Sequence, residues 1–250
     1  MNALPAPLSA MDVAREATRL LRENTALLYG LALIAAIPAA FFRPVFLEGD
    51  IDASTPGAAL TWIGPETLVG GLGLWMLSVV TAASAARAIA GHYGGRTPQL
   101  SEAFGDGLAQ LLPLAWTSLL ALVAVCIGTF FFVIPGVYLG LVFVFAVPVV
   151  MLEATSGPRA LARSRELARG QLGRILGLAL LSLLAAGVAA LPMIAISPEH
   201  LWAHGAVQAA FGGLATAWVT ALFTVLYFDQ RRHGETDFDP TGFAAPLPPA

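Results

Sequence analysis

The stretch LLPLAWTSLLALVAVCIGTFFFVIPGVYLGLVFVFAVPVVML, from Leu111 to Leu152, decides the fold because its 42 residues include no charged side chain. One bilayer crossing needs about 20 apolar residues, so the stretch holds two crossings. A single continuous helix would be about 63 Å long, about twice the thickness of the hydrocarbon layer. We therefore predict a hairpin turn at Pro135-Gly136, since proline donates no hydrogen bond and glycine tolerates turn geometry. Pro113 and Pro148 are expected to bend the two helices.

The composition of the whole chain agrees with a membrane protein. Of 250 residues, 57% are apolar and 12% are charged, compared with about 25% charged in a typical soluble domain. Too few polar side chains remain to cover the apolar runs in water. The predicted fold class is all-α, a polytopic membrane bundle of six transmembrane helices in one domain over residues 1–239, with a disordered tail over 240–250. The predicted spans are residues 25–42, 67–86, 111–134, 136–152, 175–195 and 205–228.

The arginines fix the predicted orientation. The chain has 13 basic residues, all of them arginine, and six spans place every one except Arg43 on the same side. The positive-inside rule assigns that side to the cytoplasm. Both termini are therefore expected in the cytoplasm.

Three short amphipathic helices are expected on the cytoplasmic side, over residues 9–23, 101–110 and 158–172. Ser9 followed by Asp12 is typical of a helix N-cap, and Pro158 suits a first helical turn. Each helix precedes a pair of spans. The sequence therefore predicts three units, each consisting of a short amphipathic helix and a transmembrane hairpin.

Two regions of the sequence resemble a known membrane family. The matching residues are Val133-Ile134-Pro135-Gly136-Val137-Tyr138, Pro148, Glu153, Gly157-Pro158-Arg159-Ala160-Leu161, Ser164 and Leu167, and then Leu226-Tyr227-Phe228-Asp229 with Arg231, Gly234 and Asp237. They are similar to the membrane domain attached to some bacterial glycerophosphoryl diester phosphodiesterases and to related stand-alone membrane proteins. The resemblance implies a membrane fold in the bacterial cytoplasmic (inner) membrane, without an established activity. This chain departs from the pattern at Arg165, where an aromatic residue is usual.

Carboxylates at the inner ends of two spans are the main candidates for a site. Glu153 and Asp229 should pair with cations at that depth, and the expected partners are Arg163, Arg165 and Arg231. With Ser164, these residues form a predicted clamp that fixes the third amphipathic helix beneath the bundle. The alternative is a site for anionic lipid headgroups, because guanidinium groups bind phosphate oxygens. The residues expected to hold the headgroup are Arg159, Arg163 and Arg169.

No metal or other cofactor is predicted. His200 and His204 have the spacing of two ligands on one helical turn, but the sequence offers no obvious third ligand beyond the neighbouring Glu199. The chain also lacks a glycine-rich phosphate loop. No soluble segment is long enough for the metal-binding barrel that phosphodiesterase chemistry needs.

These features predict a non-catalytic membrane module that organises anionic lipid, or a protein partner, through its arginine-rich face. The alternative is a small-molecule or lipid transporter, although the spans carry no ionisable residue near their centres. A metal-dependent hydrolase would be the third choice, and it would depend on the histidine pair. No nucleic acid is expected as a partner. Small residues recurring within the spans would allow an oligomer.

Overall fold

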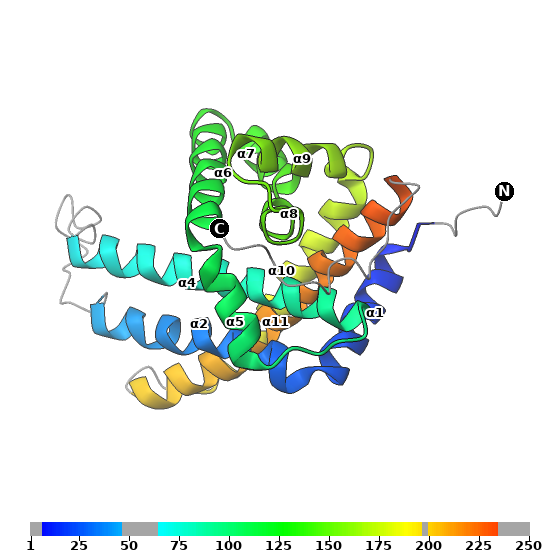
Figure 1. Cartoon of the computed structure of the whole chain (residues 1–250). Coiled ribbons are helices and arrows are strands. Elements are labelled where there is room, and N and C mark those ends of the chain that lie inside the picture. The colour runs from blue at the N-terminus through cyan, green and yellow to red at the C-terminus, as the bar shows by residue number, and fades with distance from the viewer. Residues whose placement is uncertain (1–6, 47–64, 197–199, 235–250) are drawn as a thin grey trace.

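The computed structural model describes residues 7–46, 65–196 and 200–234, and this part of the chain is helical, without strands (Figure 1). The all-α fold class is therefore confirmed. The helices are α1 (Ala10–Glu23), α2 (Thr25–Phe46), α4 (Pro65–Tyr93), α5 (Leu100–Ala109), α6 (Leu111–Phe131), α7 (Val133–Val142), α8 (Ala146–Glu153), α9 (Pro158–Ala168), α10 (Leu172–Ile194) and α11 (Leu201–Gly234).

Six stretches of helix are long and apolar enough to cross a membrane: α2, α4, α6, α7 with α8, α10, and α11. They match the six predicted spans in order. The last helix, α11, is longer than its predicted span and ends in a basic turn containing Arg231 and Arg232. The predicted tail over residues 240–250 lies outside the described residues.

The turn between α6 and α7 lies earlier than predicted. Phe132 is the one residue between the two helices, and its backbone is extended (φ −156°, ψ 139°). Pro135 lies in the first turn of α7, where a missing N–H breaks no helical hydrogen bond. Gly136 instead allows close packing, because a Cβ atom there would lie 1.9 Å from the Thr129 Oγ1 atom of α6. Both residues shape the hairpin, but the turn itself is Phe132.

Proline has different effects in the two halves of this hairpin. Pro148 has no N–H to donate to the carbonyl of Val144, and the helix breaks just before it, at the turn Phe143–Phe145 that separates α7 from α8. The predicted bend at Pro148 is confirmed. Pro113 lies in the first turn of α6, which continues without interruption, so the bend predicted there is wrong.

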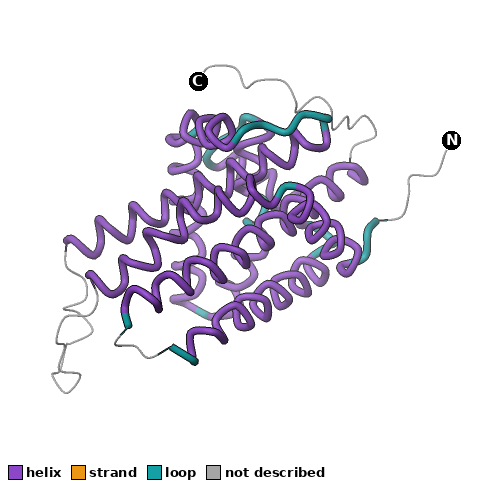
Figure 2. The backbone as a smooth tube through the Cα atoms, turned by 90° about the horizontal axis from the view of Figure 1, so that it is seen from below, coloured by secondary structure: helices purple, strands orange, loops and turns teal. Residues whose placement is uncertain are grey.

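The helices form three consecutive units, as the sequence predicts: α1 with α2 and α4, α5 with α6 to α8, and α9 with α10 and α11. Short loops connect most of them (Figure 2). In each unit an amide residue (Asn24, Gln110 or Gln171) directly precedes the first spanning helix. The second span of each unit contacts the short helix of the next, with α4 on α5 and α8 on α9. The contact of α11 with α1 closes the circle.

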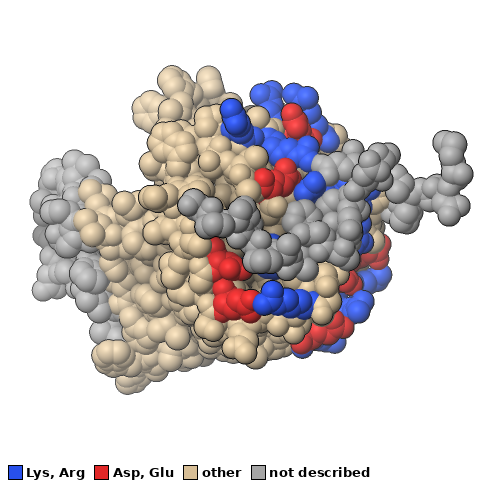
Figure 3. Space-filling model, viewed as in Figure 1, with Lys and Arg blue, Asp and Glu red and all other residues tan. Residues whose placement is uncertain are grey.

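Charged side chains gather on one half of the molecule. On the face that Figure 3 shows, the blue and red atoms occupy the half that carries α1, α5 and α9, whereas the described residues of the opposite half are tan. The largest fully buried side chains include Phe145, Met151 and Tyr227, which pack among α8 and α11. By contrast, α6 and α10 expose many leucines, as expected for helices that face lipid.

Candidate functional site

The connection between α8 and α9 brings the predicted clamp together. Gly157 has φ 62° and ψ −138°, a conformation that essentially only glycine adopts. Its N–H donates to Thr117 Oγ1 at 2.7 Å. A Cβ atom at Gly157 would lie 2.8 Å from the Trp116 indole nitrogen. The chain therefore requires glycine here to turn sharply and start α9 at Pro158.

Glu153, at the end of α8, is the centre of a carboxylate clamp formed by Glu153, Arg163, Tyr227 and Arg231. Arg163 Nε donates to Glu153 Oε2 at 3.0 Å, and the Tyr227 hydroxyl donates to Oε1 at 2.8 Å. Arg231 Nη1 lies 3.7 Å from the same Oε1 atom. The clamp therefore ties α8, α9 and α11 together, and Arg163 and Arg231 are partners of Glu153 as predicted.

Ser164 secures α9 to the break in the fourth span. Its hydroxyl donates to the Val142 carbonyl at 2.7 Å, and both residues are buried. The N–H of Ala146, which a continuous helix would direct to Val142, bonds Phe143 instead. Ser164 thus satisfies a carbonyl that the proline-induced break leaves without its helical donor.

Arg165 does not belong to the clamp, and that part of the prediction is wrong. It is exposed. Residues two apart on a helix point to nearly opposite sides, so Arg163 and Arg165 cannot both face Glu153. The predicted helix over residues 158–172 is also shorter than expected, because α9 ends at Ala168 and Gly170 takes a positive φ of 75°.

Asp229 is nearly buried and lies apart from the clamp, with other partners than those predicted. Arg174 Nη2 donates to Asp229 Oδ2 at 2.6 Å, and the N–H of Leu8 donates to Oδ1 at 3.3 Å. The protonated form of His233 would add an ion pair at 3.6 Å. Asp229 therefore joins α11 to the start of α10 and to the segment before α1. No sequence signal distinguished Arg174 from the other arginines at the inner ends of spans.

A third polar contact at this end of the molecule joins α4 to α5. The Nε atom of Arg87, which is buried, lies 3.6 Å from Asp106 Oδ2. The sequence analysis did not single out this pair, because the second predicted span ends at residue 86, directly before Arg87. Each of the three units thus ends in a charged side chain that bonds the next unit: Arg87 to α5, Glu153 to α9, and Asp229 to the residue before the α1 cap.

The short helices differ in the charge that they present. In α1, three arginines accompany three acidic residues, and Arg15 and Arg19 pair with acids of their own helix. The acids of α5 pair with arginines outside the helix. From Pro158 to Arg169 there are four arginines and one glutamate. The exposed ones are Arg159, Arg165 and Arg169, and no ion pair joins them to a described residue. Only α9 therefore presents an excess of positive charge.

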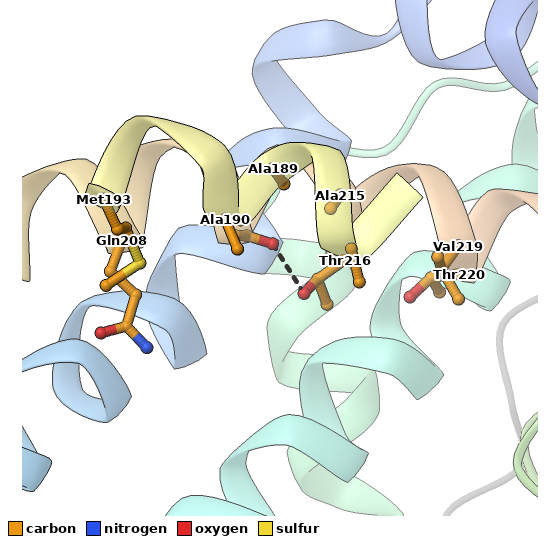
Figure 4. A pocket seen from close by; sticks show the side chains of 10 residues that line it. Ala189, Ala190, Met193, Gln208, Ala215, Thr216, Val219 and Thr220 are labelled. Carbon is orange, nitrogen blue, oxygen red and sulfur yellow. Dashed lines mark hydrogen bonds between the residues drawn. The ribbon is translucent and has the colours of Figure 1, made fainter. Parts of the chain in front are cut away.

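A groove of about 370 Å³ lies between α10 and α11 (Figure 4). Met193 and Gln208 lie at one end, and Val219 and Thr220 lie at the other. Four of its ten lining residues are alanine, and the Thr216 hydroxyl is bonded to the Gly212 carbonyl of its own helix. None of the lining residues is ionisable.

The predicted histidine pair lies away from the charged end. His200 is exposed, His204 is half-buried, and the N–H of His204 donates to the His200 carbonyl. Across residues 7–46, 65–196 and 200–234, no group of three histidine, cysteine or carboxylate side chains could hold a metal ion. Glu199 lies outside these ranges.

No family model, curated protein or solved structure matches this chain. The resemblance to the phosphodiesterase-linked membrane domain stays a prediction from the residues quoted above.

Proposed function

We propose that this protein is a non-catalytic module of the bacterial cytoplasmic membrane that holds anionic lipid headgroups against α9. The headgroup ligands are Arg159, Arg165 and Arg169, on the cytoplasmic side of the membrane. Arg163, which the sequence also offered for this role, serves the clamp instead. Both termini lie on the same side as α9.

The observation that carries this proposal is the uneven distribution of charge among the short helices. The arginines of α1 are balanced by acids in the same helix, and α5 has no arginine. The three exposed arginines at α9 have no such balance, and guanidinium groups form paired hydrogen bonds with phosphate oxygens. The clamp and the Ser164 bond fix α9 against the spans, which supports a role for its arginines at one membrane surface.

The expected contribution is large enough to measure. An arginine near an anionic membrane surface contributes about 1 kcal/mol, so three contribute about 3 kcal/mol. This free energy corresponds to roughly a hundred-fold preference for anionic over neutral lipid.

The test compares lipid retention between two triple variants. Arg159, Arg165 and Arg169 are all changed to Gln in the first variant, and Arg15, Arg19 and Arg22 in the second. Each purified protein is exposed to equal amounts of phosphatidylglycerol and phosphatidylcholine, and bound lipid is counted by native mass spectrometry. The α9 variant should lose most of its preference for phosphatidylglycerol, and the α1 variant should keep it. An unchanged preference in the α9 variant would exclude headgroup binding by α9.

The transporter alternative rests on the groove between α10 and α11. Gln208 is its most polar lining side chain, and a transport path would use that amide. Under our proposal, Gln208→Leu leaves lipid preference unchanged. A loss of lipid binding in Gln208→Leu, with the α9 variant unaffected, would favour the alternative.

A further inference from the structure

The turn of the α6–α7 hairpin is a strongly exposed apolar surface among the residues that the structure describes. Five consecutive residues have exposed fractions of 84, 69, 73, 66 and 82%: Phe130, Phe131, Phe132, Val133 and Ile134. The nearest hydroxyl, that of Thr129, is bonded to the Val125 carbonyl. This turn therefore presents aromatic and aliphatic side chains, with no polar side chain that water would solvate.

The other two hairpins have connections of a different chemistry. The sequence between α2 and α4 includes Glu48, Asp50 and Asp52, and the sequence between α10 and α11 includes Ser197 and Glu199. Such residues suit an aqueous connection between spans. The α6–α7 turn consists of one apolar residue. Water therefore suits it less well than it suits the other two connections.

The hairpin projects from the other spans. Figure 1 shows α6 rising at a steep angle to α2, α4 and α11, and the same projection is tan in Figure 3. The hairpin contacts α8 and α9, and to a lesser extent α4 and α10, but the five residues of its turn stay exposed. The turn thus stands away from the described helices, and an external medium surrounds it.

The backbone of the turn limits how deep in a bilayer the turn can lie. Phe132 N–H donates to Gly128, Gly136 N–H donates to Phe132, and Pro135 has no N–H. The N–H groups of Val133 and Ile134, and the carbonyls of Thr129 to Phe131, bond no described residue. Unbonded peptide groups are not tolerated in pure hydrocarbon. The N–H groups need acceptors such as the ester oxygens of lipids. The carbonyls need donors such as the water found at the level of those esters.

We propose that this turn is a lipid anchor, with its five side chains among the acyl chains and its backbone at the level of the lipid ester groups. The partner is the bilayer lipid itself, bound without regard to headgroup charge. The proposal does not depend on headgroup binding by α9, because the two surfaces share no residue.

A fluorescent probe on the turn tests how deep the turn lies in the bilayer. In a Cys126→Ser background, Ile134→Cys is labelled with bimane and the protein is placed in vesicles of phosphatidylcholine. Lipids carrying a doxyl quencher near the ester, lipids carrying it near the chain end, and aqueous iodide are compared. Met11→Cys, on the exposed surface of α1, is the control for a water-exposed site. Phe131→Cys provides a second probe on the same turn.

We expect the doxyl group near the ester to quench the probe at Ile134 most strongly, several-fold above iodide, with the reverse order at Met11. Iodide quenching equal to that at Met11 would place the turn in water and overturn the proposal. Quenching by none of the three would mean that protein, such as a second copy, covers the turn. Strongest quenching from the chain end would place the turn deeper than its backbone allows. Each of these three results contradicts a lipid anchor at ester depth.

Discussion

Arg163 and Arg165 lie two residues apart on α9, yet one is bonded inside the protein and the other faces outward. Arg163 donates to Glu153 and lies 3.5 Å from Glu166, whereas Arg165 is exposed. This difference gives Arg163 a structural contact and leaves Arg165 available for the lipid binding that we propose. Two matched substitutions on the same helix can separate the roles.

We expect Arg163→Gln to lower the free energy of unfolding by about 2 kcal/mol, since it removes a charged hydrogen bond from a half-buried carboxylate. Arg165→Gln should change it by less than about 0.5 kcal/mol, as is usual for an exposed position. Thermal unfolding in detergent measures both, and 1 kcal/mol corresponds to about 3 °C in a chain of this size. Equal shifts in the two variants would contradict the clamp.

Some of these residue roles were predictable from sequence. A carboxylate at the inner end of a span requires a cation, so Glu153 and Arg163 followed from charge and depth. The choice between Arg163 and Arg165 depended on the rotation of α9, which a helix with arginines on several sides does not reveal. The bond from Gly157 to Thr117 joins residues 40 apart in the chain, and no local pattern predicts it.

At the scale of elements, the Ser164 hydroxyl attaches α9 to the break in the fourth span, and the clamp attaches it to the end of that span. We expect Ser164→Ala to destabilise the protein by about 1–3 kcal/mol, since it leaves the buried Val142 carbonyl without a donor. Ser182→Ala is the control, because Ser182 donates to the Leu178 carbonyl within its own helix. Thermal unfolding and hydrogen exchange at Phe143–Phe145 should both respond to Ser164→Ala alone. Identical behaviour of the two variants would contradict the attachment.

The α1 helix should show a pH-dependent cap. The Ser9 hydroxyl lies 2.6 Å from Asp12 Oδ2, and this hydrogen bond holds the pKa of the Asp12 carboxyl below its ordinary value of 3.8. A lowered pKa in the folded protein means that the carboxylate stabilises the fold above pH 3.8, and that this contribution is lost as the pH falls through the folded pKa.

The difference in unfolding free energy between the natural protein and Asp12→Ala should therefore be constant near neutral pH and shrink in the acid range. Denaturant unfolding in detergent at stepped pH measures it. A difference that does not change with pH would show that the cap makes no ionic contribution.

The spans were predictable as elements because each is a long apolar run with an arginine-containing segment near one end. The positions of turns and breaks within the apolar runs were harder to predict. Pro113 and Pro148 are each the third residue of a helix, α6 and α8, and the sequence does not show that only the break before Pro148 falls inside a predicted span. The α6–α7 turn was misplaced because Pro135 starts a helix instead of ending one.

At the scale of the whole molecule, the order of the three units could be predicted from the sequence. The contact between the last unit and the first could not. The contact between α11 and α1 joins the two ends of the described chain, and the Leu8–Asp229 bond lies within it. Only the folded arrangement shows that each unit bonds the next. This closure places α1, α5 and α9 on one half of the protein.

The central claim is that the spans cross a bilayer with α9 on the cytoplasmic side. Single cysteines at Ala162, exposed on α9, and at Ala203, exposed near the start of α11, test it directly in the Cys126→Ser background. A membrane-impermeant maleimide should label Ala203→Cys in spheroplasts, and should label Ala162→Cys only after the membrane is permeabilised. Labelling of both cysteines in intact spheroplasts, or of Ala162→Cys alone, would contradict the account.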